Sequence, residues 1–429
     1  MEKPGFQMDR RMGAIMVRKV LMIAYHFPPL HGSSGIQRTL KFSKYLPEFG
    51  WEPVILGAHP RAFPATSDAL TAEIPEGTKV VRACAFDTAR HLSIAGKYPM
   101  PLALPDRWAS WWLAAVPAGM KLIRECKPDL IWSTYPIATA HLIGLTLNRL
   151  TGIPWVADFR DPMTDVNYPP EKARRDVYRW IERKVMENCA RAVFTTPGAV
   201  RVHRTRYPEI REGKIVEIGN GYDEENFASL SVPQPDRKRQ IVMLHSGIVY
   251  SAERDPTQFF AAISELSRSE RIKPEDLKIV LRATQNDSHI GALISSFGIG
   301  EFVEIAPPIP YREALSEMLA ADALLILQAS NCNQQIPAKL YEYLRAGKPI
   351  LALTDPAGDT ASALMNAGID TIVPLDSKEA IISGLTEFMS KVRSGTAPAA
   401  SYEKALSHSR KSGTKKLAGL FDEILNQGE

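Results

Sequence analysis

Short apolar runs, turns rich in glycine or proline, and longer segments with an apolar residue at every third or fourth position alternate along this chain. The short runs are typical of buried parallel strands, and the spaced segments are typical of amphipathic helices. From residue 19 onward the order is strand, glycine turn, helix, strand, which is how a doubly wound α/β domain begins. We expect the strands of this first half at residues 19–25, 53–56, 129–134, 154–158, 192–196 and 215–218. We expect its helices at residues 36–46, 137–150, 171–190 and from 197 onward.

The second half of the chain repeats this architecture without repeating the sequence. Its strands are expected at residues 241–244, 277–281, 302–305, 323–327, 350–354 and 371–373. The helix after residues 323–327 should begin with Pro337 at its first position and end at Gly347 and Pro349, about three turns later. Later helices are expected at residues 359–367, 377–392 and 402–425. The pattern predicts an α/β protein with two Rossmann-like, doubly wound domains.

Polar stretches set the expected domain boundaries. Residues 1–18 have scattered charges and no apolar core, so we interpret them as a flexible tail and not as a secretory signal. Residues 229–240 are polar, contain two prolines and are expected to link the domains. This division gives an N-terminal domain at 19–228, a C-terminal domain at 241–400, and a closing helix at 401–429 that should pack back on the first domain.

The composition indicates the class of protein and the cellular compartment. Hydrophobic residues make up 45% of the 429 residues and charged residues 23%, as in globular proteins. No apolar run reaches the roughly 18–20 residues that would span a bilayer. The four cysteines show neither a CxxC motif nor zinc-site spacing, which favours a reduced, cytoplasmic location.

The net charge of +4 is unevenly distributed, because residues 172–214 hold twelve Lys or Arg against five Asp or Glu. Such a segment indicates an anionic surface as partner. Its few aromatic residues form no stacking motif, so we expect no nucleic acid. Peripheral contact with the anionic inner face of a membrane is the preferred interpretation, and a solvated helix face is the alternative. The tryptophans of the irregular segment 60–112 indicate core packing, which we prefer, an acceptor-binding wall or a membrane-interface anchor.

The helix start near Pro337 is the first candidate for chemistry. Its preceding residues are poor N-caps, so the free N–H groups and the helix dipole favour an anion there. Lys339 lies in the first turn, and Glu342 follows on the same face. A cation for phosphate and a carboxylate for ribose hydroxyls would suit a nucleoside diphosphate. An ordinary surface salt bridge explains the same two residues, and the local sequence leaves both open.

Two other turns follow expected strands. The turn containing Gly32 and Gly35 is not GxGxxG, and no acid follows the second strand to bind a ribose, so we discount NAD. It still allows a ligand to approach the backbone. Asp158, Arg160 and Asp161 lie at the carboxyl end of strand 154–158, where open α/β sheets bind ligands. A capped turn with an Arg160–Asp161 pair is the alternative.

Taken together, these motifs resemble those of glycosyltransferase family 4, whose members are retaining enzymes with the GT-B fold. The resemblance covers the chain from about residue 20 to its end. It is carried by five stretches in the expected order: Tyr25 to Gly35, Ser133 to Pro136 with Asp158 to Pro162, Gly219 to Asp223, His245 to Gly247 with Arg254, and Gln334 to Pro349.

The resemblance implies two domains that face each other across a cleft. The C-terminal domain would bind the nucleoside-diphosphate sugar and the N-terminal domain the glycan, polysaccharide or lipid-linked acceptor. The donor residues it implies are Gly247, Arg254, Gln334, Lys339, Leu340 and Glu342. The cleft and acceptor residues it implies are Gly32, Gly35, Tyr135 and Asp158. It also implies no cofactor and no metal, and leaves Asp161 and Arg160 as candidates for acceptor positioning or oxocarbenium stabilisation.

One position departs from the family pattern. The family often carries two glutamates with seven residues between them; Glu342 matches the second, but Gln334 stands at the first. A neutral amide still binds sugar hydroxyls, so we expect hexosyl or N-acetylhexosaminyl transfer. The alternatives are a nucleotide-sugar epimerase and a non-catalytic sugar-nucleotide-binding subunit.

Overall fold

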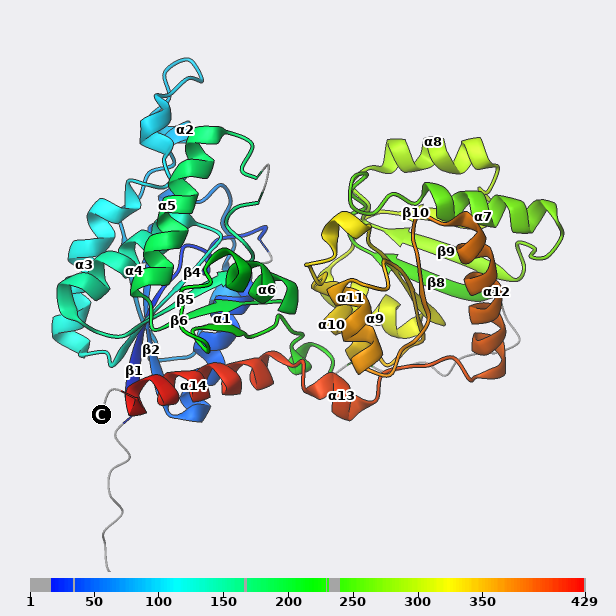
Figure 1. Cartoon of the computed structure of the whole chain (residues 1–429). Coiled ribbons are helices and arrows are strands. Elements are labelled where there is room, and N and C mark those ends of the chain that lie inside the picture. Colours follow the sequence, from blue (N-terminus) through cyan, green and yellow to red (C-terminus); the bar gives the residue numbers. More distant parts are fainter. Residues whose placement is uncertain (1–16, 34, 166–167, 229, 231–239, 428–429) are drawn as a thin grey trace, which may run out of the picture.

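The structure is a computed structural model, and it describes residues 17–33, 35–165, 168–228, 230 and 240–427. It contains two parallel sheets, each flanked by helices on both faces (Figure 1). This confirms the predicted α/β class with two Rossmann-like domains. The expected tail and linker lie largely outside the described residues, so their interpretation stays a prediction.

The first sheet has the strand order β3-β2-β1-β4-β5-β6-β7. Its strands are β1 (Arg18–Ile23), β2 (Trp51–Ala58), β3 (Lys79–Ala83), β4 (Leu130–Thr134), β5 (Trp155–Arg160), β6 (Arg191–Phe194) and β7 (Ile215–Glu217). The chain order reverses between the neighbouring strands β1 and β4, which pair with Val20 opposite Leu130. A crevice opens at the carboxyl ends of the strands at such a reversal, and ligands bind there in open α/β sheets.

The second sheet has the order β10-β9-β8-β11-β12-β13. Its strands are β8 (Ile241–Ser246), β9 (Leu277–Arg282), β10 (Val303–Ala306), β11 (Ala323–Leu327), β12 (Ile350–Leu353) and β13 (Ile372–Val373). Here the reversal falls between β8 and β11, which pair through Ala323 opposite Met243. The glycine turn after β8 and the loop after β11 therefore leave the sheet side by side.

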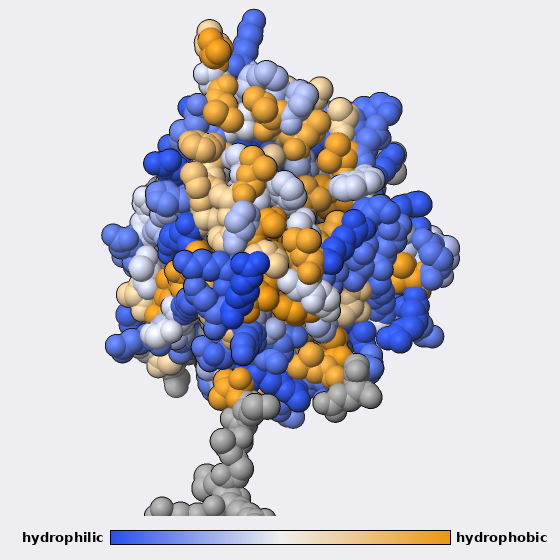
Figure 2. Space-filling view, turned by 90° about the vertical axis from the view of Figure 1, so that its left-hand side faces the viewer, coloured by the Kyte–Doolittle hydropathy of each residue, from blue (hydrophilic) through white to orange (hydrophobic). Residues whose placement is uncertain are grey.

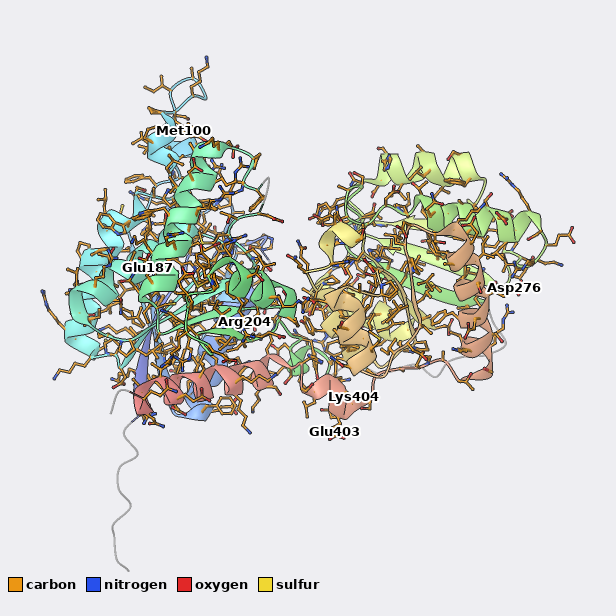
Figure 3. All side chains as sticks on the ribbon, in the orientation of Figure 1. Met100, Glu187, Arg204, Asp276, Glu403 and Lys404 are labelled. Atoms are coloured by element: carbon orange, nitrogen blue, oxygen red, sulfur yellow. The ribbon has the colours of Figure 1, made fainter. Side chains whose placement is uncertain are left out.

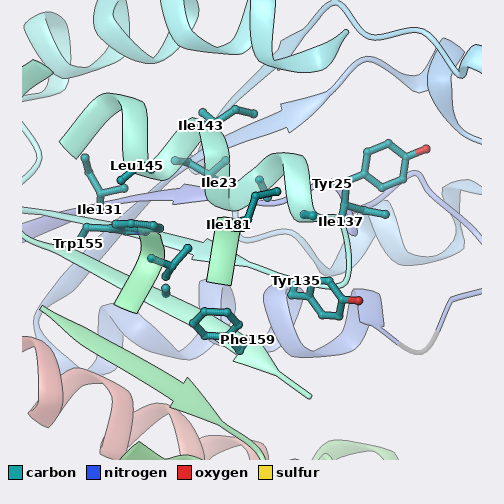
Figure 4. Packing of buried hydrophobic residues seen from close by; sticks show 14 of the residues in the cluster. Ile23, Tyr25, Ile131, Tyr135, Ile137, Ile143, Leu145, Trp155, Phe159 and Ile181 are labelled. Atoms are coloured by element: carbon teal, nitrogen blue, oxygen red, sulfur yellow. The ribbon is translucent and has the colours of Figure 1, made fainter. Parts of the chain in front are cut away.

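Helices cover both faces of the first sheet (Figure 1). One face packs against α3 (Trp111–Cys126), α4 (Ala138–Thr151), α5 (Lys172–Asn188) and α6 (Pro197–Arg206). The opposite face packs against α1 (Gly35–Tyr45) and the last helix of the chain, α14 (Arg410–Asn426). Figure 4 shows the first of these cores, where Ile131 and Trp155 of the sheet meet Ile143 of α4. All three side chains are fully buried.

The second sheet is covered in the same way. On one face lie α7 (Thr257–Arg268), α8 (Asp287–Phe297) and α12 (Lys378–Ser394). On the other lie α9 (Tyr311–Ala320), α10 (Lys339–Ala346), α11 (Asp359–Asn366) and the short α13 (Tyr402–Leu406). Both cores consist of apolar strand residues that alternate between the two faces, as expected for parallel strands buried on both sides.

Helix α14 crosses back to the N-terminal domain and completes its second core (Figure 1). Phe421 is fully buried, and its ring meets the ring of Trp51 edge-on at 5.0 Å. The carboxylate of Asp422 accepts hydrogen bonds from Trp51 Nε1 at 3.0 Å and from the Arg18 guanidinium at 2.8 Å. The end of the chain thus belongs structurally to the domain with which the chain begins.

Three elements differ from the sequence expectations. The stretch 60–112 is not wholly irregular, because it contains β3, the short helix α2 (Thr88–His91) and the start of α3. Pro117 lies within α3 and obscures its helical pattern. Helix α10 begins at Lys339 and not at Pro337, so it is shorter than expected, although Gly347 ends it with φ 64° as predicted. The expected closing helix is two helices, separated at Ser407 to Ser409.

Candidate active site at the strand ends

The glycine turn after β8 lies directly beside the first residue of α10. Gly247 has φ 115°, a backbone conformation that favours glycine. A Cβ placed on it would stand 3.1 Å from Lys339 Nζ. The absence of a side chain at Gly247 therefore lets the lysine amine lie against the backbone of the turn. The structure brings together two residues that the sequence predicted for donor binding.

Lys339 has a neutral histidine as its hydrogen-bond partner. Its Nζ lies 2.9 Å from His245 Nε2, and His245 Nδ1 lies 2.9 Å from the carbonyl oxygen of Leu325. The Nδ1–H tautomer satisfies both contacts, since Nδ1 then donates to the carbonyl and Nε2 accepts from the ammonium. Burial, followed by the charge of Lys339, holds the pKa of His245 well below its usual value.

Lys339 and Arg254 are two cations close enough to repel each other. Burial, followed by the positive charge of Arg254, holds the pKa of Lys339 well below its ordinary value of 10.5. The Arg254 guanidinium lies 5.1 Å from the Tyr250 ring and donates to the carbonyl oxygen of Ile248 at 2.6 Å. Among the described residues neither cation has a carboxylate within ion-pair distance. Two converging cations without a counter-ion form a site of positive potential.

The start of α10 adds backbone donors to this site. Ala338 is its N-cap residue and offers no side-chain hydrogen bond. Leu340 is buried in the core and uses its N–H on the carbonyl oxygen of Pro337, at 2.9 Å. Within the described chain, the N–H groups of Ala338 and Lys339 make no hydrogen bond. Free N–H groups at a helix start next to two cations are well suited to bind the oxygens of an anion such as a diphosphate.

Glu342 lies one turn further along α10. Its Oε1 accepts a 2.7 Å hydrogen bond from the hydroxyl of Tyr311, the first residue of α9. Burial raises the pKa of Glu342, whereas the Tyr311 hydroxyl and the charges of Arg410 and Lys339 act in the opposite direction. Arg410, at the start of α14, therefore brings a cation from a distant part of the chain close to Glu342. Tyr311 and Arg410 lie in no recognised motif, and sequence reasoning missed both.

Gln334 lies where the two domains touch. Its backbone oxygen accepts a 2.8 Å hydrogen bond from Thr196 Oγ1, and its side chain is exposed. The N–H of Gly198 donates at 2.5 Å to Asp359, the first residue of α11. These contacts join the loop after β6 to the segment before α10. Because strands within each sheet are parallel, the carboxyl ends of the two sheets meet at this contact.

In the N-terminal domain, Gly35 begins α1 and is closely surrounded. A Cβ on Gly35 would stand 2.7 Å from an Arg160 guanidinium nitrogen and would collide with the His26 ring. Burial, followed by the charge of Arg160, lowers the pKa of His26 to about 4, so this imidazole is neutral at pH 7. Gly32, with φ 82°, has open space around it. The sequence predicted Gly35 and Arg160 separately, and the structure places them in contact; His26 is a further neighbour that was not singled out.

The side chain of Asp158 is buried and has a structural role. It has no exposed surface, and Arg38 holds it with two hydrogen bonds of 2.8 and 2.9 Å. Thr134 Oγ1 donates a third, at 2.8 Å. Arg38 also donates to the carbonyl oxygens of Ile218 and Gly219, so Asp158 anchors the guanidinium that ties β5 to the turn after β7. The carboxylate thus supports the cleft wall and does not face it.

At this strand end Asp161 is exposed and Arg160 is partly exposed. Arg160 has φ 65° and donates to the carbonyl oxygen of Tyr135 at 3.2 Å. Asp161 is accessible to solvent although much of the surrounding space is protein. That burial raises the pKa of Asp161, and the charges of Arg160 and Arg38 oppose the shift. Tyr135 is almost fully buried beside Tyr178, at 6.4 Å between ring centroids. Asp161 and Arg160 are therefore a charged pair that is at least partly accessible at this strand end.

No group of three or more His, Cys, Asp or Glu side chains among the described residues could hold a metal ion. No helix in the described part of the chain is both long and apolar enough to cross a bilayer.

Comparison with known proteins identifies a domain model that matches the N-terminal part of the chain. The family model described as a glycosyl transferase 4-like domain matches residues 34–221. A search of curated proteins finds no match. Sucrose-phosphate synthase from Thermosynechococcus elongatus superimposes with a TM-score of 0.65 at 14% identity, over 96% of this chain and all of that one.

Two further solved structures share the architecture. HepE of Anabaena, solved with UDP-glucose, has a TM-score of 0.62 at 13% identity, over 94% of this chain and 99% of its own. WaaG, a glycosyltransferase of lipopolysaccharide biosynthesis, has a TM-score of 0.60 at 14% identity, over the same shares of the two chains. At such identities the likeness shows the fold. Residues 34–221 thus match a glycosyl transferase 4-like domain, and the described chain has the GT-B fold, which is consistent with a glycosyltransferase of the family 4 type.

Proposed function

We propose that the protein is a retaining glycosyltransferase that moves a sugar from a nucleoside-diphosphate sugar to a glycan, polysaccharide or lipid-linked acceptor. The observation that carries this proposal is the pair of uncompensated cations, Lys339 and Arg254, beside the uncapped start of α10. HepE, which shares the fold, was solved with UDP and with UDP-glucose, which supports a nucleotide-sugar donor.

The donor would lie across the reversal point of the second sheet. Its diphosphate would be attracted by the positive charges of Lys339 and Arg254 and would accept hydrogen bonds from the free N–H groups at the start of α10. Gly247 would let the phosphates approach the backbone, and Glu342 would accept hydrogen bonds from ribose hydroxyls. The exposed side chain of Gln334, at the domain contact, would reach the sugar. We expect no metal to be required, because these groups already supply the positive charge.

In the transfer step, an acceptor hydroxyl oxygen forms a bond to the anomeric carbon while the bond from that carbon to the diphosphate oxygen breaks. Attack from the leaving-group face retains the configuration, and the hydroxyl proton passes to the departing diphosphate. Lys339 and Arg254 would stabilise the growing phosphate charge, an effect that is worth about 10²–10³ in rate per donor in preorganised sites. Asp161 and Arg160 would position the acceptor or stabilise the positive charge on the sugar ring.

The first experiment is a thermal-shift panel of nucleoside diphosphates and their sugars. A donor at 100 times its Kd should stabilise the protein by about 2.7 kcal/mol. The donor that stabilises the protein is then radiolabelled and incubated with the protein and with extracts that contain glycan, polysaccharide or lipid-linked acceptors. The Asp161→Asn and Lys339→Ala variants are assayed in parallel. Loss of turnover in both variants would support the assigned site. Full turnover in both would refute it.

A non-catalytic sugar-nucleotide-binding subunit is the second candidate, and the residue that favours it is Gln334 in place of the family's glutamate. Gln334→Glu separates the two possibilities. If the chain lacks turnover only because of this residue, the variant should gain transfer or donor hydrolysis. If the wild type already transfers sugar, the substitution should alter the choice of donor, and the binding-only candidate is wrong.

A further inference from the structure

The segment between β3 and α3 forms a protrusion that rises from the N-terminal domain (Figure 1). Four large apolar side chains of this segment are exposed: Leu92 at 41%, Ile94 at 85%, Met100 at 51% and Leu102 at 47%. Figure 3 shows Met100 at this end of the molecule. Figure 2, which views this side, shows hydrophobic residues gathered at the tip and over the upper part of the face. We call residues 88–104 the apolar tip.

The apolar tip has a defined internal structure. Ile94 and Lys97 exchange backbone hydrogen bonds of 2.8 and 3.0 Å around a turn whose central residues, Ala95 and Gly96, both have positive φ. Two positive φ angles are the geometry of a tight hairpin turn. The hydroxyl of Thr88 donates to the carbonyl oxygen of Leu102 at 2.8 Å and so ties the two ends of the tip together. The hydrophobic side chains are thus held outward by a built loop.

The exposed charges of this region have a single sign. Between residues 84 and 110 the two acids, Asp87 and Asp106, are buried, whereas Arg90 and Lys97 are exposed. The start of α5 lies next to the same segment, because the charge of Arg174 acts on Asp106, but Lys172 and Arg174 there are paired with Asp176 and Glu171. A small convex group of apolar side chains flanked by the exposed cations Arg90 and Lys97 matches the boundary between anionic headgroups and acyl chains.

The base of the protrusion connects to the candidate site. Trp108 packs on Tyr25, with 4.7 Å between ring centroids, and Tyr25 follows β1. Tyr25 and Trp108 both donate hydrogen bonds to the carbonyl oxygen of Ala62, which follows β2. The apolar tip therefore rises from the carboxyl edge of the first sheet, the same edge that carries Arg160 and Asp161.

We propose that the apolar tip inserts into the headgroup layer of a membrane that contains anionic lipids. Leu92, Ile94, Met100 and Leu102 would enter the interface to a depth of roughly 5–10 Å, as shallow peripheral segments do. Arg90 and Lys97 would contact the lipid phosphates. Among the tryptophans considered from the sequence, Trp111 is fully buried, as the core-packing interpretation expects, and Trp112 is 36% exposed, so the apolar tip is an exposed group in addition to that cluster. Docking in this way presents the acceptor side of the cleft to lipid-linked molecules.

The test uses the full chain and vesicles of phosphatidylcholine with and without phosphatidylglycerol, in a flotation assay. The wild type should bind the anionic vesicles and be released by salt, because lipid charges beyond a Debye length are screened. Ile94→Glu with Met100→Glu should weaken partitioning by about tenfold or more, since two apolar groups are lost from the interface. Met365→Glu, at a methionine of the second domain that is 52% exposed, is the matched control and should bind as the wild type does.

Two variants that each remove one lysine charge complete the design. Lys97→Gln should weaken binding to anionic vesicles but not to neutral ones, and Lys415→Gln, on α14, should change neither. Equal binding by the wild type and the double variant, or no binding of the wild type at low salt, would overturn the proposal. Concentration-dependent dimerisation that the double variant abolishes would assign the tip to a protein interface and overturn it equally. Thermal stabilisation by nucleotides should be unchanged in the double variant, so this result is separate from the proposed catalysis.

Discussion

Lys339→Gln is the substitution that most directly tests the diphosphate site. In the free protein the Lys339 ammonium is buried, lies near Arg254 and has a neutral histidine as its hydrogen-bond partner. A glutamine at this position keeps an N–H donor for His245 Nε2 while it removes the positive charge. Lys339→Met is the companion variant, because it removes both the charge and the donor.

The structure predicts that Lys339→Gln changes the stability of the free protein and the affinity for the nucleotide in opposite directions. Below its lowered pKa, Lys339 is charged in both the folded and the unfolded state, and folding then bears the full cost of burying the ammonium. Between that lowered pKa and 10.5 the unfolded state binds more protons, so the cost falls as the pH rises. Lys339→Gln should therefore leave the free protein as stable as the wild type or more stable at pH 7. Lys339→Met should cost about 1–3 kcal/mol more than Lys339→Gln, because His245 then loses its buried donor.

Binding should change in the opposite direction. A charge-assisted hydrogen bond is worth about 1.5–3 kcal/mol, so Lys339→Gln should weaken binding of the nucleoside diphosphate by about 10- to 150-fold. A bound anion also raises the pKa of the lysine, and the wild type should take up protons on binding at pH values just above the lowered pKa. Isothermal titration calorimetry in two buffers of different ionisation enthalpy measures both the affinity and the proton uptake, and calorimetric unfolding measures stability.

The reasoning fails if Lys339→Gln lowers the melting temperature by several degrees while nucleotide affinity stays unchanged. That combination would make Lys339 a structural residue. Lys415→Gln, at an exposed lysine of α14, controls for the general effect of removing a positive charge. It should change neither stability nor affinity by more than about 0.5 kcal/mol.

Three further predictions concern other parts of the molecule. Burial raises the pKa of Glu342 above 4.5, so the wild-type unfolding free energy should fall as the pH rises from 4.5 through the raised pKa. Glu342→Gln should remove this part of the pH dependence and weaken nucleotide binding. An identical pH profile of stability for the two proteins would contradict this prediction. Gly35→Ala should displace Arg160 and His26 and reduce transfer more than donor affinity, as judged by kcat against thermal shift with donor. Phe421→Ala should destabilise the protein by about 3–5 kcal/mol in denaturant unfolding, whereas Lys415→Ala should stay within about 0.5 kcal/mol; equal effects would show that α14 is not part of the core.

The sequence was sufficient to locate twelve of the thirteen strands along the chain, all but β3, whereas the order of strands within each sheet and the reversal points come from the structure. Buried parallel strands are nearly continuous apolar runs, and the turns after them are marked by glycines such as Gly35 and Gly247. Once β8 and β11 are known to be neighbours, Lys339 must lie near Gly247. Element boundaries were less accurate at α10, where Pro337 lies before the helix, and in the stretch 60–112, where short elements carry too little periodicity to be recognised.

Contacts between distant segments could not be predicted in this way. Lys339 meets His245 across 94 positions of the chain, and Arg38 meets Asp158 across 120. The local pattern at Asp158 indicates a charged strand end, but only the fold reveals that Arg38 and Thr134 occupy its oxygens. Arg410 approaches Glu342 because α14 returns to the first domain, a path that no local motif encodes.

The return of α14 to the first domain also bears on how the chain is synthesised. Trp51, Leu40 and the neighbouring apolar side chains of one sheet face are covered by residues 417–424, near the very end of the chain. On the ribosome, the N-terminal domain therefore emerges before the C-terminal domain, but one face of its sheet stays uncovered until residues 417–424 have followed. All strands and helices of the C-terminal domain, from β8 to α13, precede α14, so this domain is the first that can complete its cores. Order of synthesis and order of completion are thus reversed, and a chain that ends before Arg410 would leave the first domain, not the second, unfinished.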